Sequence, residues 1–277
     1  MSGSESTASR VSSVSTATAA HWVERWECQQ QRYAVDRAER FTVIADVVEH
    51  TTGAPARART GVRTGARGGP GRLVLDLGSG PGALAALLAD RLPDAEVLAV
   101  DADPLLLELG RAHYGSARLR HVQALIGAPG WLDGLGLDRP LDAAVSTTAL
   151  HYLSEDALRR VYRDLAERLC PGGVLVNGDH IAPDSAGIRA LAADIGRRHC
   201  ERNLAFTHED WASWWSGAAE DPELAALLPR ADSPGHPPCS SADLPVAAHT
   251  ALLHEAGFTH VGTVWQHGTS RVLAALR

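Results

Sequence analysis

The chain contains no lysine, so all 26 of its basic residues are arginine, and its 33 acidic residues give a formal net charge of −7. Nucleic-acid binding depends on a basic surface that neutralises phosphates, so an acidic chain is a poor candidate for it. The densest group of arginines, between residues 57 and 72, is interleaved with Gly, Thr and Ala and has no aromatics. This composition favours a solvated linker over an RNA-binding surface.

Cysteines are few and long apolar runs are missing. The four cysteines lie far apart and form no Cys-x-x-Cys pair, which argues against a zinc site or a disulfide framework. We therefore expect no metal site. No run approaches the ~20 apolar residues of a membrane span, and the Ser/Thr-rich start lacks the apolar segment of a signal peptide. These absences predict a cytoplasmic protein without a membrane partner.

Short apolar strands alternate with amphipathic helices through the middle of the chain. This alternation predicts right-handed crossovers and a parallel sheet with helices on both faces. The expected strands are 73–77, 97–101, 118–124, 141–147 and 174–179, with helices at 83–92, 104–113 and 155–169. Near the end, helix 246–256 precedes strands 259–266 and 270–276. The turn at His267-Gly268 is so short that these two strands must be antiparallel.

Composition divides the chain into five parts. We predict a disordered lead at 1–20, N-terminal lid helices and a linker at 21–71, and a cofactor-binding core at 72–184. A Trp-rich helical lid insertion is expected at 185–245, and a helix with a β-hairpin at 246–277 completes the sheet. His21 to about His50 has apolar residues at helical spacing and reads as one or two helices.

The most informative segment is Leu73–Gly82, an apolar strand that ends in Asp76 and continues into glycines at alternate positions. Glycines at a strand-to-helix turn let the backbone approach a ligand closely, since no Cβ intervenes. The next strand ends in Asp101, where a Rossmann-like sheet grips a ribose diol. The Gly-x-Gly-x-Gly spacing differs from the dinucleotide pattern, and Asp76 would repel a phosphate but suit an ammonium group.

These residues resemble the first motif of the class I S-adenosylmethionine-dependent methyltransferases, which has three apolar residues, an acid and alternate glycines. Residues 171–176, Pro-Gly-Gly-Val-Leu-Val, resemble the turn into that family's fifth strand. The resemblance implies an α/β, Rossmann-like, doubly wound sheet of seven strands with an antiparallel last strand, plus a helical lid. It implies S-adenosyl-L-methionine as cofactor.

By this resemblance, particular residues should hold the cofactor. The backbone at Gly78, Ser79, Gly80 and Gly82 would cradle its methionine part, and Asp76 would favour its amino group directly or through water. Asp101 would accept hydrogen bonds from both ribose hydroxyls. Other contacts are expected from residues at the tips of neighbouring strands, namely Ala102, Leu125, Ile126 and Thr147. Asp103 could also lie in the site, but capping the helix that begins at Pro104 is the favoured role.

Two strand tips depart from familiar patterns. Residues 122–126, Val-Gln-Ala-Leu-Ile, lack the acid that many members use for the adenine amine, so we expect apolar contacts and backbone groups to recognise adenine. Residues 146–152 lack the paired prolines of enzymes that methylate nucleobases or glutamine. This absence favours the small-molecule branch of the family, and the metal-binding Asp/Asn cluster of magnesium-dependent catechol enzymes is not evident either.

Methyl transfer requires alignment of the acceptor and, for some acceptors, removal of a proton. His180, at the end of the fifth strand, is the leading candidate for the base, and His151 is the second. Trp26, Tyr33 and Trp211 could line an apolar acceptor pocket, although aromatics at helical spacing are more often packing residues.

The sequence thus predicts an enzyme that methylates a small, partly apolar metabolite. Two alternatives stay open: a catalytically silent cofactor-binding regulatory or scaffold subunit and, with less support, an NAD-dependent oxidoreductase. The sequence also leaves open whether the chain forms a homodimer.

Overall fold

A computed structural model describes residues 14–53, 71–228 and 244–277. Seven strands form one sheet in the order β3-β2-β1-β4-β5-β7-β6. The first five pair in parallel, while β7 is antiparallel to both β5 and β6. The strand order reverses at β1, which lies between β2 and β4, and ligands of open α/β sheets bind at such a switch point.

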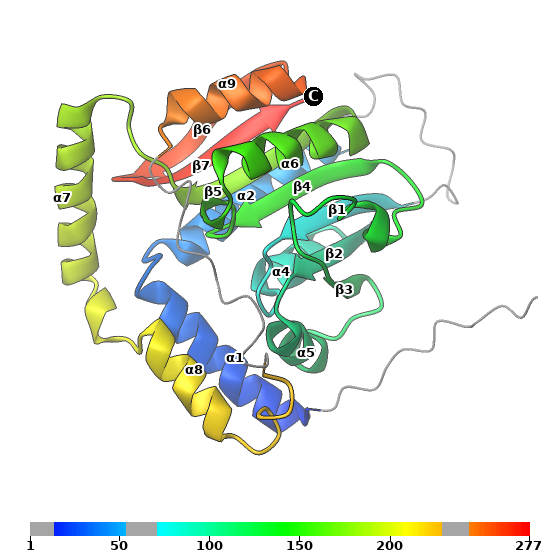
Figure 1. Ribbon diagram of the computed structural model, residues 1–277, viewed down its shortest axis with the longest axis vertical. Helices are drawn as coiled ribbons and strands as arrows, with labels where there is room; N and C mark the ends of the chain where they lie inside the picture. Colours follow the sequence, from blue (N-terminus) through cyan, green and yellow to red (C-terminus); the bar gives the residue numbers. More distant parts are fainter. Residues whose placement is uncertain (1–13, 54–70, 229–243) are drawn as a thin grey trace, which may run out of the picture.

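The elements follow the predicted alternation closely (Figure 1). The strands are β1 (Arg72–Leu77), β2 (Ala95–Asp101), β3 (Leu119–Gln123), β4 (Leu141–Thr147), β5 (Leu169–His180), β6 (His260–His267) and β7 (Ser270–Leu276). The α-helices are α1 (Thr16–Gln31), α2 (Arg37–Thr52), α4 (Ala83–Arg91), α5 (Pro104–His113), α6 (Glu155–Arg168), α7 (Ala186–Arg202), α8 (Trp211–Glu220) and α9 (Val246–Ala256). Short 3-10 helices are η1 (Asp133–Leu135), η2 (Leu150–Tyr152) and η3 (Ala205–Thr207).

Apolar side chains bury both faces of the sheet. On one face, α6 and α9 pack through residues that include the fully buried Tyr162 and Phe258. On the other face, α2 and α4 contribute Ile44 and Leu88 to a second core. Because parallel strands in such a sheet are covered on both sides, β1 and β4 read as almost continuous apolar runs.

A third apolar cluster joins segments that are distant in the sequence. Trp214 of α8 is fully buried against Trp22 and Trp26 of α1, with ring centroids 5.4 and 5.0 Å away. Leu106 and Leu109 of α5 belong to the same cluster. Figure 1 shows α1 and α8 lying side by side next to α5. Packing onto α5 therefore places α1 and α8 over one end of the sheet.

The fold class predicted from the sequence is confirmed, including the antiparallel last strand beside β5. The C-terminal boundary of the predicted disordered segment 1–20 was wrong, because Ser15 caps α1 and residues 16–20 are already helical. The N-terminal segment forms two helices and not one. The rest of the predicted lead, most of the linker and the loop at 229–243 lie outside the described residues.

Among the described helices, none combines the length and the apolar composition that crossing a bilayer requires.

We expect Trp214→Ala to lower the free energy of unfolding by about 3–5 kcal/mol, because it leaves a large cavity between α1 and α8. Urea unfolding followed by circular dichroism would measure the change. Ser216→Ala, an exposed position on the same helix, is the control and should change stability little. Equal effects of the two variants would contradict the proposed packing role of α8.

Candidate functional site

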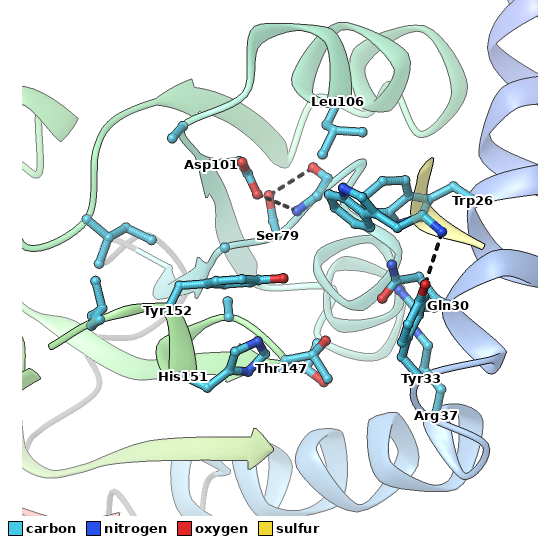
Figure 2. Close-up of a pocket in the computed structure, with 18 of the residues that line it drawn as sticks. Trp26, Gln30, Tyr33, Arg37, Ser79, Asp101, Leu106, Thr147, His151 and Tyr152 are labelled. Atoms are coloured by element: carbon cyan, nitrogen blue, oxygen red, sulfur yellow. Dashed lines mark hydrogen bonds between the residues drawn. The ribbon is translucent and has the colours of Figure 1, made fainter. Parts of the chain in front are cut away.

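A cavity of about 580 Å³ opens where β1, β2 and β4 end, beneath α1 and α8. Residues from all five predicted strand tips meet there (Figure 2). The predicted site residues that line it are Trp26, Tyr33, Gly78, Ser79, Gly80, Asp101, Ala102, Leu125, Ile126, Thr147, His151, His180 and Trp211. Asp76 and Gly82 do not line it. The cavity size is typical of small-molecule sites.

The glycine loop after β1 presents bare backbone to the cavity. Gly78 and Gly80 have φ angles of 66° and 56°, in the left-handed region that glycine adopts without strain. A Cβ on Gly78 would lie 2.2 Å from the Cβ of Ala149, and one on Gly80 would lie 3.4 Å from the Trp26 ring. Side chains at either position would therefore fill space between the loop and the opposite wall.

Asp101 holds this loop in place. One carboxylate oxygen accepts a hydrogen bond of 2.8 Å from the amide of Gly80, and the other accepts one of 3.0 Å from the amide of Asp103. These bonds orient the carboxylate at the tip of β2, where it faces the cavity. Asp103 caps α5 by accepting from the amides of Leu105 and Leu106, as predicted.

Asp76 lies behind the glycine loop and is completely buried. Among the described residues, neither of its carboxylate oxygens makes a hydrogen bond of ordinary geometry. Burial, with a further contribution from the charge of Asp101, raises the pKa of Asp76 to about 7. The nearby charge of Arg37 and the backbone of Ala85 offset this burial only in part, and a ligand ammonium group would stabilise the ionised form further.

Gly82 has a role in packing and does not line the cavity. It has a φ of 102° and begins α4, and a Cβ there would lie 3.0 Å from Nε2 of His121. The close packing of the loop against β3 accounts for a glycine at this position.

His151 and Asp179 form a hydrogen-bonded pair at the cavity. Nδ1 of His151 lies 2.9 Å from Oδ1 of Asp179, whose side chain is 3% exposed. Burial alone would raise the pKa of Asp179, but the hydrogen bond and charge of His151, together with nearby His180, leave that pKa below its usual range. Because an ionised carboxylate only accepts, Nδ1 carries the proton. In the neutral tautomer with the proton on Nδ1, Nε2 is the atom that can accept a proton, as a base requires.

His180 lines the same cavity, but the protein engages both of its ring nitrogens. Nε2 donates to the carbonyl oxygen of Tyr33 over 2.8 Å, and Nδ1 lies 3.3 Å from the hydroxyl of Thr269. Burial lowers the pKa of His180. The ring therefore connects the end of β5 to the α1–α2 loop.

Aromatic rings form the wall contributed by the helices. Trp26 and Trp211 meet edge to face with centroids 5.2 Å apart, and the amide of Trp211 donates to the Tyr33 hydroxyl over 3.0 Å. Tyr152 extends its hydroxyl into the cavity above His151 in Figure 2. Leu125 is 63% exposed at the cavity, so it lies where a bound ring could cover it.

Sequence reasoning missed part of the lining, which includes Gln30, Arg37, Leu106, Ala124, Thr148, Ala149, Tyr152 and Leu153. Arg37 is the important omission. It is buried, forms an ion pair with Glu27 and stacks 4.3 Å above the Phe41 ring. A charged residue between apolar helix positions is expected to face solvent, so nothing in the sequence indicated that Arg37 would line the cavity. Tyr152 follows His151 directly and could have been found from that position.

Part of the chain is similar in sequence to known methyltransferases. Residues 74–173 match a family model described as a methyltransferase domain. A trans-aconitate 2-methyltransferase of Methylobacterium radiotolerans is 34% identical over 57% of this chain and 52% of that protein. The protein of the same name from Streptomyces coelicolor is 30% identical over 67% of this chain and 55% of that protein. The chain thus spans about half the length of these curated relatives.

Solved structures show the same fold. An O-methyltransferase family protein from Burkholderia thailandensis aligns with a TM-score of 0.51 and 18% identity, over 90% of this chain and 62% of that one. The methyltransferase family model and the methyltransferase relatives agree with the main prediction and not with the NAD-dependent alternative. The bare glycine loop, the buried Asp76 and the oriented Asp101 fit S-adenosylmethionine as the cofactor. Residues 74–173 thus carry a methyltransferase domain, and this part of the chain is similar to the class I S-adenosylmethionine-dependent methyltransferases.

Proposed function

We propose that the protein transfers a methyl group from S-adenosylmethionine to a small, partly apolar molecule whose acceptor atom loses a proton. The hydrogen-bonded pair of His151 and Asp179, facing the same cavity as the glycine loop, carries this proposal. The bound cofactor supplies the methyl group on a positively charged sulfur. The protein's task is to align the acceptor and to remove its proton.

Four parts of the cavity would hold the cofactor. Asp101, oriented by two backbone amides, would accept from the ribose hydroxyls. The backbone of Gly78 and Gly80 would contact the methionine part, and Asp76 would compensate the charge of its ammonium directly or through a water. Leu125 and Ile126 would cover the adenine, with Ala102 and Thr147 beside the nucleoside.

His151 is the better-placed base of the two predicted histidines. Asp179 fixes its tautomer and would stabilise the imidazolium that forms when Nε2 takes a proton from the acceptor. His180 already donates to the Tyr33 carbonyl, so we assign it the positioning of the α1–α2 loop. Trp26, Tyr33, Tyr152 and Trp211 would then surround an apolar or aromatic acceptor bearing a hydroxyl group.

A carboxylic acid is a second candidate for the acceptor. Arg37 brings a guanidinium to the cavity, and its Nε is buried without a partner among the described residues. Relatives named trans-aconitate 2-methyltransferases are consistent with an acid. A carboxylate is already ionised at neutral pH, so its methylation needs no base.

We expect Asp101→Ala to weaken the binding of S-adenosylhomocysteine about 10- to 100-fold, because charged hydrogen bonds to the ribose are lost. Isothermal titration calorimetry would measure the affinity. Asp90→Ala, which removes an exposed acid on α4, should bind as the parent protein does. Unchanged affinity in Asp101→Ala would remove Asp101 from the ribose role.

Cofactor affinity should also depend on pH through Asp76. Below its raised pKa of about 7, the free protein holds Asp76 protonated, and the carboxyl must lose this proton to compensate the ligand ammonium. The affinity for S-adenosylmethionine should therefore rise by up to about tenfold per unit between about pH 5 and 7, then level off. Calorimetry in buffers of different ionisation enthalpy should detect the released proton. Asp76→Asn should bind weakly without this dependence, and a pH-independent parent protein would contradict the assignment.

The acceptor proposal is tested by methyl transfer from labelled cofactor to panels of small phenols and small carboxylic acids. With a hydroxyl acceptor, His151→Ala should reduce kcat by about 10²- to 10⁴-fold and leave cofactor affinity unchanged. His50→Ala, at an exposed position on α2, is the control. Full activity of His151→Ala toward phenols would refute the base. Transfer to acids alone, independent of His151, would favour the carboxyl-methylating alternative.

A further inference from the structure

Three segments outside the methyl-transfer cavity bring two imidazoles and one carboxylate together. Asp36 lies in the α1–α2 loop, His199 near the end of α7, and His267 at the end of β6. Nε2 of His199 is 2.7 Å from Oδ1 of Asp36, and Nδ1 of His267 is 3.5 Å from Oδ2 of the same carboxylate. One possible ligand atom from each residue lies within 4.8 Å of the other two.

The orientation of Asp36 is unusual for its position. Asp36 is the residue that precedes α2, where an aspartate side chain commonly accepts from the first amides of the helix. Here the side chain makes no such capping bond and turns toward the two histidines. Their rings lie close together in a tilted arrangement, with a centroid distance of 3.9 Å and an interplanar angle of 41°. The geometry thus gathers three metal-ligating groups at the expense of a helix cap.

The spacing is close to what tetrahedral zinc requires. Zinc bonds to imidazole nitrogen and carboxylate oxygen at about 2.0–2.2 Å, which places tetrahedral ligand atoms about 3.3 Å apart. The two histidines contact different oxygens of Asp36, at 2.7 Å from Oδ1 for His199 and 3.5 Å from Oδ2 for His267. A small rotation of the carboxylate and a longer His199 contact would let one ion bind all three groups. The three side chains are 15%, 18% and 33% exposed for Asp36, His199 and His267, so an ion can enter from solvent.

The backbone of Ala192 and Gly196 in α7 lies close to Gly268 of the β6–β7 turn, but among the described residues α7 buries little apolar surface that would bring the three ligands together. Within this helix Ala192 is the buried residue, while Ile188, Leu191 and Ile195 are large apolar side chains at least 40% exposed. Figure 1 shows α7 standing beside the layered core, at the edge formed by β6 and β7. Apolar packing therefore contributes little to the position of His199.

We propose that Asp36, His199 and His267 bind a divalent transition-metal ion, with Zn²⁺ as the ion that suits two imidazoles and one carboxylate. Water would complete the coordination. The ion would connect α7 and the β6–β7 turn to the α1–α2 loop, which also carries the cavity residue Tyr33. The site lies outside the cavity lining, so its role is to hold the cavity wall and not to take part in methyl transfer. This site revises the sequence-based expectation that no metal is bound.

The second ring nitrogen of His199 has a polar neighbour, as bound histidines usually do. Nδ1 lies 3.3 Å from the side-chain amide of Asn203, one turn further along. Reorientation of that amide lets its oxygen accept from Nδ1–H once Nε2 coordinates the ion.

Calorimetry of Zn²⁺ binding to the untagged, metal-stripped full chain tests the proposal. We expect one site of high affinity, and little binding of Mg²⁺ or Ca²⁺, which prefer oxygen ligands. His199→Ala and His267→Ala should each weaken Zn²⁺ binding by at least about 100-fold, since even changes around metal ligands cost 10- to 100-fold. His260→Ala, an exposed histidine on the same strand as His267, is the matched control and should keep the parent affinity.

Hydrogen exchange provides the structural readout. Zn²⁺ should slow amide exchange in α7 in the parent protein and in His260→Ala, and should have no effect in His199→Ala. Circular dichroism of each metal-free variant would verify that it is folded. Absence of Zn²⁺ binding to the parent protein would overturn the proposal. Equal Zn²⁺ affinity of the parent protein, His199→Ala and His267→Ala would overturn it as well.

Discussion

The hydrogen bond from the Gly80 amide to Asp101 is the constraint on which the site depends. It joins the turn after β1 to the tip of β2, so two neighbouring strands define one cavity wall. The loop can adopt this path because Gly78 and Gly80 have positive φ and carry no Cβ. The same arrangement buries Asp76 beneath the loop, where its carboxyl makes no hydrogen bond of ordinary geometry with the part of the chain that the structure describes. The path of the glycine loop therefore determines both the shape of this cavity wall and the burial of the Asp76 carboxyl.

The opposite side of the cavity depends on the end of β5. Asp179 is buried there and orients His151 of η2, while the next residue, His180, contacts the α1–α2 loop. Two adjacent residues thus position both a candidate base and part of the helical wall. Side chains that alternate in direction along a strand make this division possible. The antiparallel pairing with β7 supports it, since Thr269 and Ser270 lie beside His180.

The helices over the cavity are attached in two different ways. Trp214 and its neighbours bind α1 and α8 to α5 through a buried aromatic cluster. Among the described residues, α7 has no comparable apolar cluster; it lies against the Gly268 turn and contacts Asp36 through His199. The fixed helices supply Trp26 and Trp211 to the cavity. A ligand that binds at His199 and Asp36 would therefore affect the position of α7.

The sequence by itself determined the alternation of strands and helices in the core, the antiparallel hairpin at the end and the cofactor motif. These follow from local signals: apolar runs of strand length, a short turn at Gly268, and glycines spaced around Asp76 and Asp101. Only the tertiary structure decided which histidine pairs with Asp179, that Arg37 reaches the cavity, and that Asp36 meets His199 and His267. Those outcomes depend on contacts between residues far apart in the chain, and local spacing carries no information about them. Gly82 is an example of a local pattern that misled. Its position in the motif suggested ligand contact, but the tertiary structure packs it against His121 and away from the cavity.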